Sequence, residues 1–258
     1  MKGLWNDLLR RPGAALRYGA ILACLAVPMT GRARADSAID PARQIMGRVT
    51  YPAKAWTIDS WLDYHLNKFK DENRDTLSHT LELGYGFTDS LSMEWGIESR
   101  EGPRRSFIYD RLQLEARYQV LKRPFQLAPV LGYAPSLRGG PDRLELALEA
   151  IKNSGDYFFQ FMGGADSENE GSGRELGGSV QLGVYHRFGA GSVVGGAWKY
   201  QSDGEQELSV PVSVVLGKDV FFGFTPSFGL SRRAPELSAL FLVDIYFGPY
   251  ALLDWMLE

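Results

Sequence analysis

Apolar and polar residues alternate along most of the chain from residue 56 to 247. At the start of this region, Ile58 and Leu62 share one face of an extended chain, whereas Asp59 and Asp63 share the other. Successive side chains of a strand point to opposite faces, so such a strand has one apolar and one charged side. In a soluble sandwich the apolar sides meet in a core, whereas in a membrane barrel they face lipid and the polar sides line the lumen.

The lengths of the connections favour the membrane barrel. Connections after even-numbered strands are short and rich in turn-forming residues, as at 88–90 and 217–219, whereas those after odd-numbered strands are mostly longer and more polar, as at 68–75 and 165–173. Bacterial outer-membrane barrels combine an even strand number with short periplasmic turns and longer external loops. We therefore predict an all-β fold, a single antiparallel transmembrane β-barrel of about twelve strands with both termini periplasmic. The expected strands are 56–67, 76–87, 91–99, 107–120, 125–135, 142–151, 157–164, 174–188, 193–201, 207–216, 220–230 and 236–247.

Two prolines interrupt this pattern. Pro211 and Pro226 each remove a backbone donor from a predicted strand, so a bulge or a strand break is expected at either position. Residues 248–258 are expected to form a periplasmic tail or the end of a last strand with shifted register. The chain ends in Glu258, whereas many such barrels end in an aromatic residue.

The N-terminus has the features of a secretory signal. Arg10 and Arg17 precede an apolar run at 18–29, which is too short to span a bilayer, and Ala35 ends an A-x-A cleavage site. An amphipathic surface helix and lipidation at Cys24 are the alternatives. The expected organisation is a cleaved signal peptide at 1–35, a periplasmic N-terminal segment at 36–55, the barrel at 56–247 and the tail or strand end at 248–258.

Cleavage after Ala35 changes the charge and the available chemistry. It removes six of 28 basic and one of 31 acidic residues, which leaves a net charge of −8 and makes nucleic-acid binding unfavourable. No cysteine remains, so disulfides and metal–thiolate sites are excluded. The three histidines are too few and too scattered for a metal site, and no motif indicates a cofactor.

The expected polar face carries both signs of charge, and two interpretations follow. Either these side chains pair across a narrow, filled lumen and hold the barrel together, or they line a water-filled path and set solute preference. Twelve strands lie between filled eight-stranded barrels and open porins of 16–18 strands. The lumen-lining candidates are Glu82, Glu94, Glu98, Arg111, Glu115, Arg117, Glu145, Glu149 and Arg187, and the candidates for aromatic membrane girdles are Trp56, Tyr85, Trp95, Trp198 and Tyr200.

An enzyme site is the second class of function considered. His79 falls on the expected lipid face, where a base for lipid hydrolysis would be useful, but its neighbour Ser78 points to the opposite face. A serine on an adjacent strand would be needed, which periodicity does not reveal. No catalytic residue is therefore assigned.

One segment resembles a known group of proteins. Residues 81–97, LELGYGFTDSLSMEWGI, resemble the E-x-G-x-T-D hairpin of porin-like outer-membrane barrels of proteobacteria, which include transporters encoded near phenol-degradation genes. The strand at 109–118 is similar to the same group. The resemblance implies an outer-membrane channel or structural barrel and carries over no catalytic residues.

The expected function is a narrow channel for small solutes, or a structural envelope barrel, in a bacterial outer membrane. The expected partners are outer-membrane lipid, the barrel-assembly and periplasmic chaperone machinery, and a small solute. An outer-membrane lipid-modifying hydrolase is the alternative, and a soluble periplasmic β-protein would follow if the apolar faces closed on each other.

Overall fold

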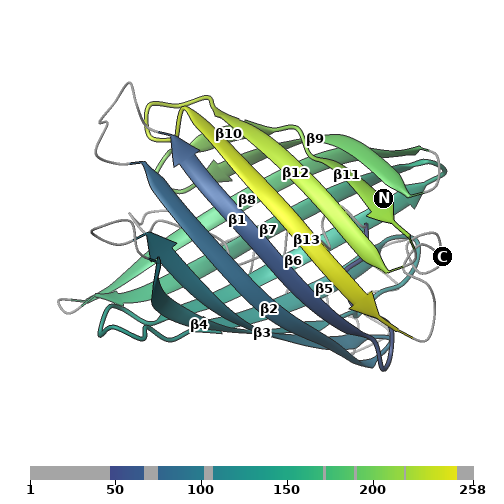
Figure 1. Cartoon of the computed structure of the whole chain (residues 1–258), viewed down its shortest axis with the longest axis horizontal. Coiled ribbons are helices and arrows are strands. Elements are labelled where there is room, and N and C mark those ends of the chain that lie inside the picture. Colours follow the sequence, from purple (N-terminus) through teal and green to yellow (C-terminus); the bar gives the residue numbers. More distant parts are fainter. Residues whose placement is uncertain are drawn as a thin grey trace, which may run out of the picture.

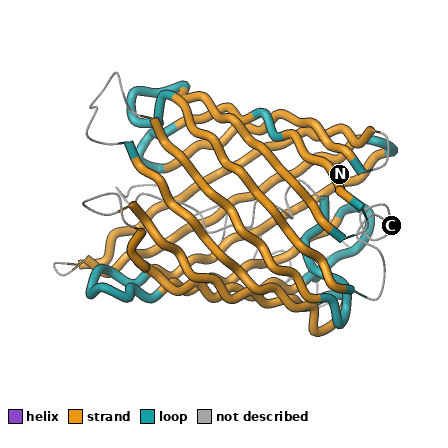
Figure 2. Tube along the Cα trace, viewed as in Figure 1, coloured by secondary structure: helices purple, strands orange, loops and turns teal. Residues whose placement is uncertain are grey.

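The computed structural model describes residues 47–66, 75–101, 107–170, 173–188, 191–217 and 219–248, which form strands and turns (Figures 1 and 2). The predicted signal peptide and residues 249–258 lie outside these ranges. No helix of the described residues is long and apolar enough to cross a membrane. The strands are β1 (Trp56–Leu66), β2 (Thr76–Thr88), β3 (Leu91–Glu101), β4 (Phe107–Tyr118), β5 (Gln126–Ala134), β6 (Arg143–Ser154), β7 (Tyr157–Glu170), β8 (Gly173–Phe188), β9 (Ser192–Gln201), β10 (Gln206–Ser209), β11 (Val212–Leu216), β12 (Val220–Gly229) and β13 (Leu237–Phe247).

The sheet closes on itself into a barrel. Neighbouring strands are antiparallel, and β13 pairs with β1 along its whole length, from Trp56↔Phe247 to Leu66↔Leu237 (Figure 1). Strands β10 and β11 share one position between β9 and β12, so the wall has twelve strand positions, and the predicted all-β antiparallel barrel of about twelve strands is confirmed. Closure gives every strand a hydrogen-bonded neighbour on both sides, the arrangement that a lipid environment demands. We call the end where β1 begins and β13 ends the turn end, and the opposite end the loop end.

The predicted break at Pro211 is present and leaves the register intact. The pairs Ser209↔Ala197 and Val212↔Val194 flank it, three residues apart on both strands, so no residue is inserted as a bulge would require. The Gly195 amide donates to the Pro211 carbonyl (2.9 Å), but proline has no N–H to return the bond.

The expected interruption at Pro226 was wrong, because β12 runs through it. Pro226 pairs with Ala239 on one side, and on the other its carbonyl accepts the Val210 amide (2.9 Å). Pro226 has no N–H to donate to the Val210 carbonyl in return, so the absent bond lies beside the break between β10 and β11.

The expected loop at 165–173 was also wrong. Strands β7 and β8 continue to Glu170 and Gly173, and only residues 171–172 separate them. A spanning strand needs about 9–11 residues, which β7 and β8 exceed with 14 and 16. A hairpin that extends beyond the bilayer meets water on both faces and needs no apolar side. Its sequence therefore lacks the alternation of apolar and polar residues, and it resembles that of a polar loop.

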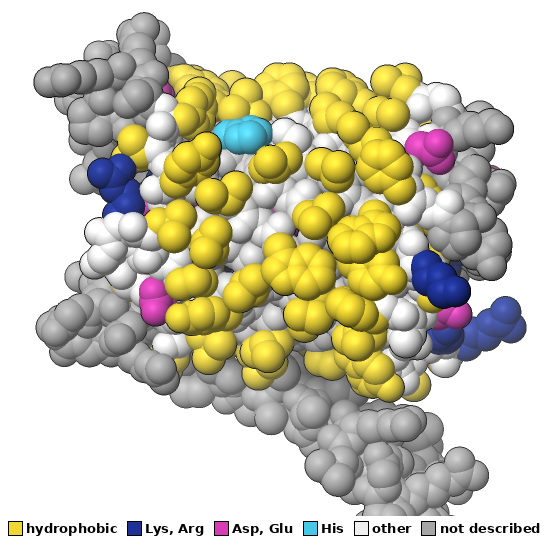
Figure 3. Space-filling view, turned by 60° about the horizontal axis from the view of Figure 1, so that its bottom comes forward, with side chains coloured by type: hydrophobic (Ala, Val, Ile, Leu, Met, Phe, Trp, Pro, Cys, Tyr) yellow, Lys and Arg dark blue, Asp and Glu magenta, His cyan; other side chains and the backbone are white. Residues whose placement is uncertain are grey.

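The outer surface is apolar, as predicted. Side chains proposed to face outward are exposed, including Leu81 (45%), Leu114 (39%) and Phe222 (39%). Figure 3 shows hydrophobic side chains in a broad band over the middle of one face, with most charged side chains towards the two ends. The apolar faces therefore point away from the interior, and the condition for a soluble periplasmic β-protein is not met.

Candidate functional site: the barrel interior

Residues 47–55, which we call the mouth segment, fold into the barrel at the turn end. Val49 and Tyr51 are fully buried. The Val49 amide donates to Gln126 Oε1 (3.4 Å), and the Tyr51 hydroxyl donates to Asp59 Oδ2 on β1 (3.3 Å). The segment expected to lie in the periplasm before the barrel therefore forms, in its described part, an internal wall of the lumen.

Two glycines of β2 make room for this segment. A Cβ on Gly84 would lie 2.7 Å from the Tyr51 ring, and one on Gly86 would lie 1.9 Å from the Pro52 carbonyl oxygen. The Gly86 backbone also bonds the segment, since its amide donates to the Ala55 carbonyl (3.0 Å) and its carbonyl accepts the Lys54 amide (2.6 Å). Both glycines belong to the hairpin that carries the family resemblance.

A cluster of buried apolar side chains fills the lumen next to the mouth segment. The rings of Phe158 and Tyr185 stack within it, with centroids 4.6 Å apart. We call this cluster, with the mouth segment, the plug, and it occupies the lumen near the turn end. Its members are Val49, Tyr51, Ala55, Trp61, Ala128, Ile151, Phe158, Tyr185, Val193, Ala197, Val215, Phe221, Leu242 and Tyr246.

A buried charged network lies on the wall beside the plug. Arg117 Nε donates to Glu115, and Arg117 Nη1 donates to Glu149 Oε2 on β6 (2.6 Å). Gln160 of β7 donates to the other oxygen of Glu149 (2.9 Å) and accepts the Tyr185 hydroxyl of β8 (3.0 Å). Paired in this way, the charges tolerate burial that an isolated ion would not.

Small inward residues on β5 make this network possible. Arg117 lies on β4 and Glu149 on β6, so their ion pair passes over β5. The inward β5 positions near it are Ala128, Val130 and Gly132, and their short side chains leave space for the long guanidinium arm. Because the inward side chains of β5 are short here, charged side chains of its two neighbours, β4 and β6, can contact each other.

A second set of ion pairs follows the inner face towards the loop end. Arg111 donates to Glu168 of β7 (2.9 Å), and Arg100 bonds Glu98 (3.2 Å) and Asp110 (2.5 Å). These side chains are more exposed than the central network. They link β3, β4 and β7 across the lumen.

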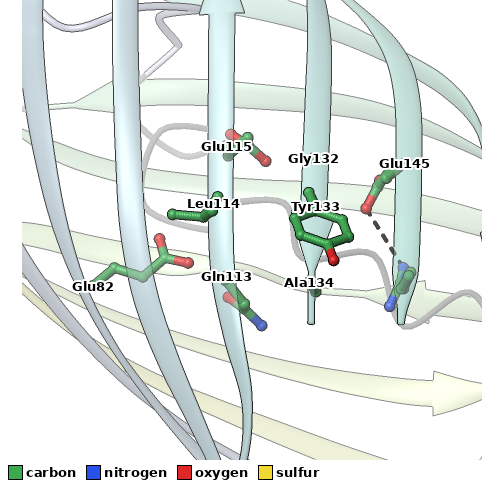
Figure 4. Close-up of a pocket in the computed structure, with 9 residues that line it drawn as sticks. Glu82, Gln113, Leu114, Glu115, Gly132, Tyr133, Ala134 and Glu145 are labelled. Atoms are coloured by element: carbon green, nitrogen blue, oxygen red, sulfur yellow. Dashed lines mark ion pairs between the residues drawn. The ribbon is translucent and has the colours of Figure 1, made fainter. Parts of the chain in front are cut away.

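A cavity of about 20 Å³ borders the central network at Glu115 (Figure 4). Glu82, Gln113 and Glu115 line it from β2 and β4, and Glu145 lies opposite beside Arg143 (3.5 Å). That volume holds about one water molecule. Among the described residues, paired side chains therefore occupy this part of the lumen.

The interior is strongly acidic. Among the described residues, the buried charged side chains are ten carboxylates and two guanidinium groups, those of Arg117 and Arg143. A path through this interior would attract cations and repel anions.

The structure places all nine lumen-lining candidates on the inner face, in three settings. Glu82, Glu94, Glu115, Arg117, Glu145 and Glu149 are buried in the middle of the barrel. Glu98 and Arg111 lie nearer the loop end and are partly exposed. Arg187 lies near the turn end, where its guanidinium stacks on the Phe158 ring (4.5 Å) and donates to Asn153 (3.0 Å).

Several buried charges were not among the candidates. Asp59 and Asp244 lie directly opposite each other on β1 and β13, both fully buried. Asp166 falls in the segment expected to be a loop. The polar face expected for β1 already contained Asp59, so that residue had a usable signal, whereas Asp244 is hidden within an apolar run.

The girdle candidates lie on the outer face near the two ends of the barrel. Trp56 and Tyr85 pack together near the turn end, with centroids 4.3 Å apart, and Trp198 and Tyr200 stack near the loop end at 6.2 Å. Trp95 packs edge-on against Phe87 (6.4 Å). Two loop-end tyrosines, not among the candidates, donate their hydroxyls to acidic loop residues: Tyr64 to Asp75 (3.3 Å) and Tyr133 to Asp142 (3.1 Å).

One polar contact stands out on the apolar outer surface. Ser60 Oγ lies 3.0 Å from His79 Nε2, and both side chains point outward from β1 and β2. This is the cross-strand serine that His79 needs for nucleophilic chemistry. Within the described part of the chain, no carboxylate or amide side chain hydrogen-bonds the other ring nitrogen of His79.

Comparison with solved structures identifies the architecture. An outer-membrane channel from Pseudomonas putida F1 superposes with a TM-score of 0.61 at 12% identity, over 81% of this chain and 100% of that chain. KdgM porin and NanC porin give TM-scores of 0.57 and 0.55 at 12% and 11% identity, each over 74% of this chain and 99% of the other. The barrel has a porin-like fold. No protein-family model and no curated protein matches the porin-like barrel by sequence.

Proposed function

We propose that this porin-like barrel is an outer-membrane channel for small solutes, closed in the described conformation by its plug. The observation that carries the proposal is a polar and charged inner face between the plug and the loop end, inside a barrel whose outer face is apolar. Burying a carboxylate costs free energy even when it is paired, so a role towards solutes or ions accounts for the buried carboxylates better than a purely structural role does. The porin-like fold supports the same function.

The proposal includes a location and partners. Residues 1–35 act as a signal peptide, both termini face the periplasm, and assembly into the outer membrane uses the periplasmic chaperone and barrel-assembly machinery. We also propose that the chain belongs to the E-x-G-x-T-D group of barrels, on the resemblance of its 81–97 hairpin. In this chain, two glycines of the hairpin, Gly84 and Gly86, have a structural role, because they leave space for the mouth segment.

The acidic interior assigns a solute preference. We expect the purified barrel, refolded from Asp36 onward, to show small conductance steps in planar bilayers with higher permeability to K⁺ than to Cl⁻. Replacing Glu82 and Glu145 by glutamine removes two lining charges, so the permeability ratio should move towards one.

The matched control is Glu101→Gln, which removes a carboxylate at the exposed end of β3. It should leave the ratio unchanged. Anion selectivity of the parent protein, or equal effects of the two variants, would contradict a path lined by Glu82 and Glu145.

The Ser60–His79 contact favours hydrolysis of lipid esters as a second candidate. Ser60 Oγ would attack the ester carbonyl while His79 Nε2 takes its proton, and the protonated His79 would then give this proton to the departing alcohol as the ester C–O bond breaks. Water, deprotonated by His79, would hydrolyse the acyl-Ser60 ester to the free fatty acid and return the proton to Ser60 Oγ. If so, Ser60→Ala and His79→Ala should each reduce hydrolysis of a phospholipid by at least about 100-fold, the scale of a lost general base.

Ser78→Ala is the control, because Ser78 is adjacent to His79 but points inward. It should retain full hydrolysis. If the parent protein, folded in mixed micelles, hydrolyses no ester, then the contact only satisfies two polar groups in an apolar surface.

A further inference from the structure

A second, larger cavity opens at the turn end, outside the plug. Its volume is about 900 Å³, within the range of small-molecule sites. The mouth segment forms one side, through Arg48 and Thr50, and the β4–β5 connection forms the other, through Lys122, Arg123 and Phe125. None of these residues contributes to the acidic interior.

The charge of this cavity is opposite to that of the lumen. Arg48, Lys122 and Arg123 line it, and Asp89 is the one carboxylate among its lining residues. Asp89 Oδ1 already accepts the Ala53 amide of the mouth segment (3.1 Å). Lys122 and Arg123 are exposed and form no ion pair with any described residue.

Neutral groups complete a surface suited to an organic ligand. Gln119 and Asn153 add amide side chains, and Phe125 adds an aromatic wall. The cavity is many times larger than a phosphate ion, whereas cations, amides and an aromatic face together suit a carboxylate carried on an organic scaffold.

We propose that this cavity binds a small organic anion bearing carboxylate groups. Such a ligand would contact Arg48 on the mouth segment and Lys122 and Arg123 on the β4–β5 connection at once. By bridging the two, it would hold the mouth segment in place and favour the closed lumen. Binding at this site does not depend on conduction, so it can be tested apart from the proposed channel.

The test is isothermal titration calorimetry with citrate on the refolded protein in a zwitterionic detergent. We expect saturable binding that weakens as NaCl is raised, since the contacts are between charges. Lys122→Gln with Arg123→Gln should weaken binding about tenfold or more, and Arg48→Gln should also weaken it. Arg138→Gln, an exposed cation in the loop between β5 and β6, is the matched control and should leave binding unchanged.

Two further probes separate carboxylate recognition from general attraction of anions. Uncharged trimethyl citrate should not bind, and inorganic phosphate should bind at least about tenfold more weakly than citrate. The absence of saturable citrate binding, equal affinity in the Lys122/Arg123 variant, or equal affinity for phosphate would each overturn the proposal.

Discussion

Replacing Gly86 by alanine is expected to unseat the mouth segment and raise conductance through the barrel. The added Cβ would lie 1.9 Å from the Pro52 carbonyl oxygen and 3.1 Å from that of Tyr51, both backbone atoms that cannot rotate away. Overpacking of this kind costs about 1–3 kcal/mol, which would shift a closed–open equilibrium by roughly 5- to 150-fold. The measurement is the time-averaged conductance of single barrels in planar bilayers, compared with the parent protein.

The matched control is Gly196→Ala on β9. A Cβ there meets no atom within 4 Å, so the substitution adds a methyl group to a strand without touching the plug. It should behave like the parent protein in conductance and in heat-modifiable gel mobility. A chain that begins at Trp56 and therefore lacks the mouth segment provides a second open form. If the parent protein, Gly86→Ala and the chain that begins at Trp56 all fold and none of them conducts ions, the lumen is filled permanently and the barrel is not a channel.

Replacing Arg117 by alanine should produce the largest loss of stability. The guanidinium lies fully buried between Glu115 and Glu149, and its removal leaves two carboxylates close together in the interior. Breaking a buried ion pair by removing one partner costs about 3–5 kcal/mol. Unfolding in urea, followed by tryptophan fluorescence and by gel mobility, should show a correspondingly lower midpoint.

Two control variants test whether the loss of stability comes from the unpaired carboxylates. Arg138→Ala removes an exposed arginine and should change the free energy of unfolding by less than about 0.5 kcal/mol. Arg117→Met combined with Glu115→Gln and Glu149→Gln removes all three charges together and should recover most of the lost stability. An unchanged midpoint for Arg117→Ala alone would show that Arg117 does not bridge these carboxylates.

Alternation was sufficient to predict the wall of the barrel. Ile58 and Asp59 fall on opposite faces in any extended chain, and the same regularity in the other strands gave their number, their outward faces and the lumen-facing charges. The break at Pro211 was also predictable, because the lost donor is a property of proline itself.

Contacts between strands were not predictable, because they depend on register. Alternation assigns a face to Ser60 and to His79 separately, but only the pairing of β1 with β2 brings them within 3.0 Å. The same holds for Arg117 and Glu149, whose contact also depends on small residues of the intervening strand. A single sequence contains no direct record of these alignments.

The plug was missed for a different physical reason. The expectation of a polar lumen assigns every apolar residue to lipid, yet Phe158 and Phe221 point inward and are fully buried. Each has apolar neighbours on both sides along the chain, so its strand lacks a polar face at the turn end. That local loss of alternation was the available signal, and it marks where a barrel has a core of its own.

The two prolines beside β10 and β11 have a consequence for how the barrel fails. Pro211 cannot donate to the Gly195 carbonyl, and Pro226 cannot donate to the Val210 carbonyl, so consecutive residues of one strand position lose a ladder bond, one on each side. This strand position is therefore held to β9 and to β12 by fewer backbone hydrogen bonds than an uninterrupted strand would have. Under heat or mechanical force, we therefore expect the barrel to open first along the two sides of this strand position, which would expose the buried carboxylates of the interior to lipid.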